Sequence, residues 1–161
     1  MTTVVAGERA PALALRGLDG QVYRLKDTTG PVMAVFFKVD WETCRFIFPY
    51  LEKLHRAYPQ KGWHLWGVSQ DSAEDSQTFA EERGATFPIL LDEGWASSQT
   101  YDPEGVPTLF FIVPDGLVTR VVPAFQKAAL NDLSAAIADH IGVEPVVVIP
   151  DDDPAPPFRP G

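Results

Sequence analysis

The decisive stretch of this sequence reads VMAVFF at residues 32–37 and WETCRFIFP at residues 41–49. The first segment is apolar, rich in strand-forming residues and preceded by Gly30-Pro31, which predicts a strand buried on both faces. In and beyond the second segment, apolar residues recur at helical spacing. We therefore expect a helix over residues 42–58, with Asp40 or Thr43 as its N-cap. A buried strand that leads directly into a helix is the first unit of an α/β fold.

The rest of the chain extends this unit. Alternating patterns, turn residues and helix stop signals predict the following elements: a hairpin of 13–15 and 22–25, a strand at 63–69, a helix from 72 to 84, a strand at 87–91, a hairpin of 108–113 and 117–122, and a helix at 127–141. Strands that alternate with helices pair in parallel, whereas the late hairpin is antiparallel. The sequence thus predicts a mixed central β-sheet flanked by helices, with an extra N-terminal β-hairpin.

A change in composition divides the chain into a domain at residues 1–142 and an extended Pro/Asp-rich tail at 143–161. Within the tail, the apolar run at residues 146–149 is expected to pack on the domain or on a second subunit, because exposing it to water is costly. From Asp151 onward the prolines and aspartates predict an extended, mobile segment. A homodimer is left open.

Length and charge narrow the classes of function. The 161 residues suit one domain, and a formal net charge of −9 disfavours both nucleic acids and anionic membranes as partners. No secretory signal precedes the first strand, so we expect a cytoplasmic protein. A single cysteine, Cys44, excludes an internal disulfide and a cysteine-based metal cage. Neither His55 nor His64 has a second ligand at metal spacing, so we expect no metal and no cofactor.

Several motifs, taken in order, resemble those of one family. They are GERAPALAL at 7–15, VFFK at 35–38, GVSQD at 67–71 and GVPT at 105–108. Together they resemble redoxins, the thioredoxin-like relatives of the alkyl-hydroperoxide-reductase and thiol-specific-antioxidant (AhpC/TSA) proteins. The resemblance implies a thioredoxin-like fold in which Val106–Pro107 is the cis-proline loop that faces the start of the helix at 42–58.

The active-site segment departs from the family pattern, which is Cys-x-x-Cys with a proline five residues after the second cysteine. Cys44 and Pro49 keep that spacing, so the resemblance places Trp41 at the position of the first, attacking cysteine. Pro49 is then a structural residue of the helix. Without the first thiolate, dithiol-disulfide exchange is expected to be lost. The implied substrate groove consists of six residues: Trp41, Glu42, Thr43, Arg45, Val106 and Pro107.

Two functions remain open from the sequence. In the first, Cys44 is the catalytic residue of a single-thiol redox or peroxidase-type reaction, because a helix start favours a thiolate. Its partner is then a peptide or protein thiol or disulfide, or a peroxide, although Phe37 and Trp41 stand where peroxiredoxins have their proline and threonine. In the second, Cys44 is an inert core thiol. The chain is then a catalytically inactive module that binds a peptide or protein at the Trp41–Pro107 groove, and Trp41 is either an aromatic anchor for its partner or simple surface packing against the Pro107 loop.

Overall fold

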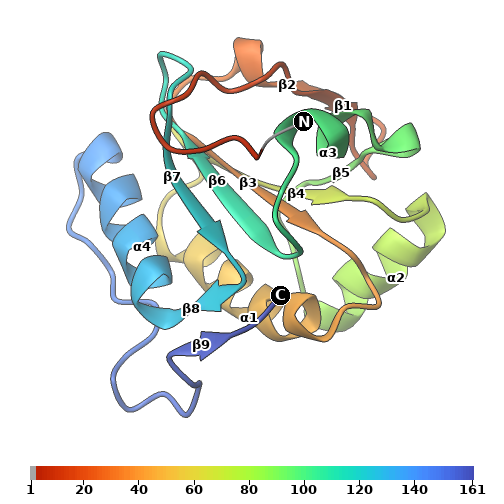
Figure 1. The fold of residues 1–161 in the computed structure, drawn as a ribbon. Coiled ribbons are helices and arrows are strands. Elements are labelled where there is room, and N and C mark those ends of the chain that lie inside the picture. The colour runs from red at the N-terminus through yellow and green to blue at the C-terminus, as the bar shows by residue number, and fades with distance from the viewer. Residues whose placement is uncertain (1–2) are drawn as a thin grey trace.

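A computed structural model describes residues 3–161 of the protein. A five-stranded mixed sheet forms its centre (Figure 1). The strand order is β5-β4-β3-β6-β7. Strands β3, β4 and β5 are mutually parallel, and β6 and β7 add to β3 as an antiparallel hairpin. Their bounds are β3 (Val32–Phe37), β4 (His64–Ser69), β5 (Ile89–Leu91), β6 (Thr108–Ile112) and β7 (Val118–Pro123). The mixed sheet that the sequence predicts is confirmed.

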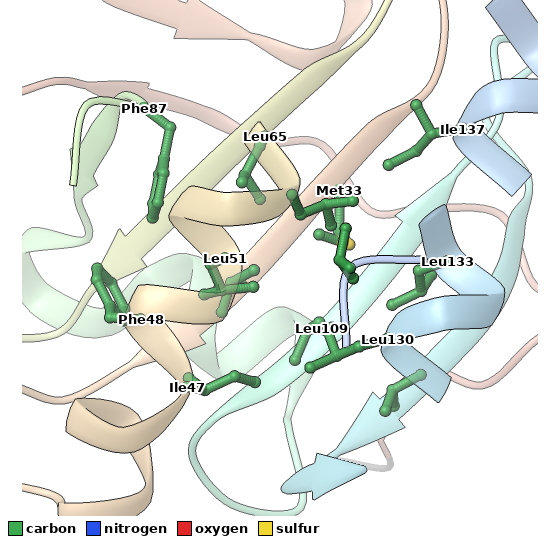
Figure 2. Close-up of a cluster of buried hydrophobic side chains, with 14 of the residues drawn as sticks. Met33, Ile47, Phe48, Leu51, Leu65, Phe87, Leu109, Leu130, Leu133 and Ile137 are labelled. Atoms are coloured by element: carbon green, nitrogen blue, oxygen red, sulfur yellow. The ribbon is translucent and has the colours of Figure 1, made fainter. Parts of the chain in front are cut away.

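Helices cover both faces of the sheet. Successive side chains of β3 point to opposite faces, and all of them are buried, so each face needs a covering layer. Met33, Val35 and Phe37 join the larger core cluster with α1 (Glu42–Ala57), α2 (Ala73–Arg83) and α4 (Lys127–Ile141). Figure 2 shows side chains of α1 and α4 meeting those of the sheet in this cluster. The other face of β3 packs under the elements β1 (Ala14–Arg16), β2 (Val22–Arg24), η1 (Leu25–Asp27) and α3 (Ala96–Tyr101).

Local signals in the sequence place most element boundaries correctly. Ser72 caps α2 by accepting a hydrogen bond from the Asp75 amide, and Gly84 ends that helix in a left-handed conformation. The expected N-cap of α1 is wrong. The capping position is Trp41, which makes no side-chain cap, and the Thr43 hydroxyl donates instead to the carbonyl of Pro160. Pro49 lies inside α1.

The short helix α3 and the 3-10 turn η2 (Glu93–Trp95) that precedes it are absent from the sequence prediction. Asp92 is buried and accepts hydrogen bonds from the amides of Ser97 and Ser98 at the start of α3. These bonds satisfy amides that a helix start leaves unpaired. A six-residue helix held by one buried carboxylate has too little periodicity to be read from the sequence.

The C-terminal segment runs back along the domain. After α4, Val148 and Ile149 are buried in the larger core cluster, as expected for packing of the apolar run on the domain, whereas Val146 and Val147 are exposed. The segment from Asp151 onward, for which the sequence predicts mobility, makes defined contacts with the domain in this structure. The segment continues against α1 and α4, and β9 (Phe158–Arg159) pairs antiparallel with β8 (Phe125–Gln126). The end of the chain then lies beside the start of α1 (Figure 1). The β8–β9 pairing joins residues more than thirty positions apart, and the contacts with α1 join residues more than a hundred positions apart, so no local signal predicts them.

In the part of the chain that the structure describes, no helix combines the length and apolar character needed to cross a membrane.

Candidate functional site

The start of α1 and the Val106–Pro107 loop lie at the same end of the sheet. Helix α1 follows β3, and the loop leads into β6, the antiparallel neighbour of β3. Phe36 is paired with Thr108, so the last residues of one strand adjoin the first residue of the other. The Val106–Pro107 peptide bond is cis. The topology therefore brings the two segments together, and we call the surface between them the groove.

Cys44 is the third residue of α1 and is completely buried in the larger core cluster. Burial raises the pKa of its thiol to about 12, and the carboxylates of Asp71 and Asp40 act in the same direction. A backbone hydrogen bond at Lys38 opposes the rise without cancelling it. The thiol is consequently protonated at neutral pH, and it has no path to solvent in this conformation.

Trp41 immediately precedes α1 and is 47 % exposed. Its carbonyl accepts the hydrogen bond from the Arg45 amide that starts the helix. Trp41 thus immediately precedes the first turn of α1 on a fixed backbone, with about half of its surface exposed. An exposed tryptophan on a rigid support can act as an aromatic anchor.

The C-terminal residues 158–161, which we call the tail tip, lie across the groove. The Arg159 guanidinium is 3.1 Å from a Glu42 carboxylate oxygen, and the Thr43 hydroxyl donates to the Pro160 carbonyl at 2.5 Å. Gly161 approaches the backbone of Val106 so closely that a Cβ on it would be 2.8 Å from the Val106 carbonyl oxygen. Glu42, Thr43 and Val106 are thereby brought together around one extended segment.

The remaining residues of the implied groove are placed differently. The Arg45 side chain donates to the Val39 carbonyl and borders a hollow beside Glu74 and Glu82, on the α2 side. The Pro107 carbonyl accepts from the amide of Ala124 and so fixes the loop to the end of β7. Arg45 therefore faces away from the tail tip, and Pro107 supports the loop.

Sequence reasoning missed the part of the site that the C-terminal segment supplies. Phe46 presents its ring to the Arg159 guanidinium at 4.5 Å from the ring centroid, and Phe125 meets Phe46 edge-on at 4.9 Å. The one sequence signal is that Arg159 is the only lysine or arginine after Lys127. Among residues 3–161, no group of three or more His, Cys, Asp or Glu side chains is placed to hold a metal ion.

The central mixed sheet, the helices on both faces and the proline loop opposite the start of α1 define a thioredoxin-like protein, and comparison with known proteins agrees. Residues 6–121 match the AhpC/TSA family, and the chain belongs to that family. Among curated relatives, the thiol-disulfide oxidoreductase ResA of Geobacillus thermodenitrificans is 30% identical over 123 residues, which are 75% of this chain and 71% of the relative. ResA of Bacillus subtilis is 28% identical over 122 residues, 74% of this chain and 68% of the relative.

Solved structures give the same fold. The thioredoxin domain of a thiol-disulfide oxidoreductase from Bacteroides vulgatus superposes with a TM-score of 0.75 at 25% identity, covering 84% of this chain and 99% of that domain. A thiol:disulfide interchange protein from Bacteroides sp. gives a TM-score of 0.72 at 26% identity, with 85% and 92% covered.

Proposed function

We propose that this chain is a binding module built on the redoxin fold, which holds an extended peptide in the groove and carries out no thiol chemistry of its own. The complete burial of Cys44 is the observation that carries the proposal. It favours this function over the single-thiol redox chemistry that the sequence leaves open.

Thiol-disulfide exchange and peroxide reduction both start from an accessible thiolate. With a pKa raised to about 12, Cys44 supplies almost no thiolate at neutral pH, and its sulfur is shielded from any substrate. The resemblance places Trp41 at the attacking-cysteine position, and an indole is neither acidic nor a useful nucleophile. The family's groove is then retained while its chemistry is lost.

The rate of Cys44 alkylation by iodoacetamide against pH tests the chemical half of the proposal. We expect the folded protein to stay unmodified from pH 6 to 9, and the denatured protein to react as an ordinary cysteine does. Rapid modification of the folded chain at pH 7, or trapping of a sulfenic acid by dimedone after peroxide treatment, would instead establish single-thiol chemistry.

That single-thiol chemistry is the second candidate, and one observation favours it. Cys44 lies in the first turn of α1, where unpaired amides and the helix dipole stabilise a thiolate. For this reaction α1 would have to move far enough to expose the sulfur to a protein thiol, a disulfide or a peroxide.

The binding half of the proposal is tested with the reduced, carboxymethylated B chain of insulin, an unfolded polypeptide without thiols. Trp41→Ala is expected to weaken its binding, because the substitution removes the exposed anchor. Trp95→Ala is the matched control, since Trp95 is equally exposed at 48 % but lies on the β4 side, where its indole donates to the Gln70 carbonyl. Equal losses in both variants would argue against the groove. A cytoplasmic location and the lack of nucleic-acid and membrane partners remain predictions.

A further inference from the structure

The tail tip is held as a bound peptide would be. Its main chain pairs with β8 through β9, and the Lys127 amide donates to the Pro157 carbonyl at 3.0 Å. β8 and β9 form a two-stranded sheet of their own, separate from the central sheet. Main-chain pairing of an extended peptide with a strand is a general mode of recognition, in which main-chain hydrogen bonds provide affinity and side-chain pockets provide specificity. The strand then continues into the groove, where Thr43 binds the Pro160 carbonyl.

One side chain of the tail tip enters a defined subsite. The Arg159 guanidinium lies over the Phe46 ring and reaches the Glu42 carboxylate on the first turn of α1. The Phe46 ring is itself fixed, because it packs against Phe125 and Tyr50. An aromatic face combined with a carboxylate recognises a guanidinium better than an ammonium, because the guanidinium can stack and donate at the same time.

The same contacts are weak enough to open. The side chain of Glu42 is 81 % exposed, that of Arg159 is 29 % exposed and Phe158 is 55 % exposed, so the ion pair is open to solvent at its carboxylate and the Phe158 ring is not enclosed. Exposed ion pairs contribute little to stability. The tail tip therefore fills the groove without being part of the core.

We propose that the groove recognises an extended peptide that carries an arginine, and that the chain's own tail tip occupies this site until such a peptide displaces it. The inference rests on the proposed binding function and names its partner class: a protein segment in extended conformation whose arginine takes the place of Arg159. Residues 158–161 act as an intramolecular competitor, present at high effective concentration because they are tethered.

The test uses the full-length chain and a fluorescein-labelled peptide with the sequence of residues 154–161, PAPPFRPG. Arg159→Glu places a like charge beside Glu42 and is expected to release the tail tip. Since apparent affinity scales with the open fraction, the variant should bind the peptide about tenfold more tightly than the wild type in fluorescence anisotropy. Faster hydrogen exchange of the Lys127 amide reports release of the tail independently of binding.

A matched control is available in the same molecule. Arg120 also pairs with a carboxylate, Asp132 at 2.7 Å, and lies over the ring of Phe111 at 5.8 Å. Arg120→Glu should therefore cause a similar loss of surface contacts while it leaves the tail tip in place and the peptide affinity at the wild-type value. Combining Glu42→Arg with Arg159→Glu restores the pair with reversed charges and is expected to close the groove again.

The outcomes separate the inference from the function on which it rests. If a peptide with alanine in place of arginine binds the Arg159→Glu variant as tightly as PAPPFRPG does, the arginine subsite is wrong but peptide binding stands. If neither Lys127 exchange nor affinity changes in that variant, the tail tip is not a competitor. If Lys127 exchanges faster and no peptide binds, the groove is not a peptide site and the proposed function fails with the inference.

Discussion

The C-terminal segment contains two stretches that cross the domain in different ways. The inner stretch, residues 146–149, buries Val148 and Ile149 almost completely. Its main chain is bonded at both ends, because the Tyr58 hydroxyl accepts from the Val146 amide and Asn131 exchanges two hydrogen bonds with Ile149. The tail tip, by contrast, is held by an ion pair with an exposed carboxylate, a cation–π contact, one hydroxyl and a two-residue strand pairing.

The inner stretch therefore serves the stability of the fold, whereas the tail tip serves the proposed binding function. Buried apolar area and satisfied buried hydrogen bonds make the inner stretch a permanent part of the core. Contacts that are individually weak and open to solvent leave the tail tip free to exchange with a competitor. The effects of substitutions on stability can therefore be compared between the inner stretch, the tail tip and Asp153, which lies between them.

The largest effect is expected from Ile149→Ala in the inner stretch. Truncating a fully buried isoleucine removes apolar contacts and leaves a cavity, which lowers the free energy of unfolding by about 2–4 kcal/mol. Val147→Ala is the control, because Val147 is 62 % exposed and its truncation should change stability by less than about 0.5 kcal/mol. Urea unfolding measures both. Similar small changes in the two variants would show that the inner stretch is not part of the core.

A smaller effect is expected from Tyr58→Phe. The hydroxyl of this buried tyrosine bonds to Ser134 on α4 and accepts from the Val146 amide at 2.8 Å. Its removal leaves buried polar groups unpaired and should cost about 1–3 kcal/mol. Tyr101→Phe removes a hydroxyl bonded to the Pro11 carbonyl, remote from the tail. Only Tyr58→Phe should therefore accelerate hydrogen exchange of the Val146 amide, and equal acceleration in both variants would contradict the anchoring role.

The two stretches also differ in how far the sequence predicts them. The packing of residues 146–149 follows from hydrophobicity alone, just as the strand at 32–37 and the helix at 127–141 follow from their patterns. The return of the tail tip to the groove does not. It depends on one arginine meeting a glutamate 117 residues away, and a proline-rich composition ordinarily indicates an extended, solvated segment.

The candidate site, too, is predicted from the sequence only in part. The resemblance of the motifs to the redoxin family implies that Trp41, Cys44 and Pro107 lie at one end of the molecule. Whether Cys44 is reactive depends on its burial, which spacing cannot reveal, because a helix start can present a thiol to solvent or to the core. The three-dimensional packing of α1 against the sheet decides that point.

The contacts of Asp153, which lies between the inner stretch and the tail tip, should weaken in acid. The pKa of Asp153 is lowered by hydrogen bonds from the Ala155 amide and the Tyr50 hydroxyl. A carboxyl whose pKa is lower in the folded state adds stability above its ordinary value near 3.8, and this stability is lost as the pH falls through the folded value. We expect the wild type to lose more stability than Asp153→Asn between pH 5 and 2.5, as chemical denaturation at each pH would measure. Parallel curves for the two proteins would exclude this effect.

The smallest effect on stability is expected from Arg159→Ala at the tail tip. The substitution removes an exposed ion pair with Glu42 and a cation–π contact with Phe46, which together contribute about 1 kcal/mol or less. Global unfolding should barely change, because no apolar surface of the core is exposed. The Lys127 amide should nevertheless exchange faster, since its acceptor is the Pro157 carbonyl at the base of the tail tip. A loss of stability as large as that of Ile149→Ala would make the tail tip part of the core, and a tail that is part of the core cannot give way to a partner peptide.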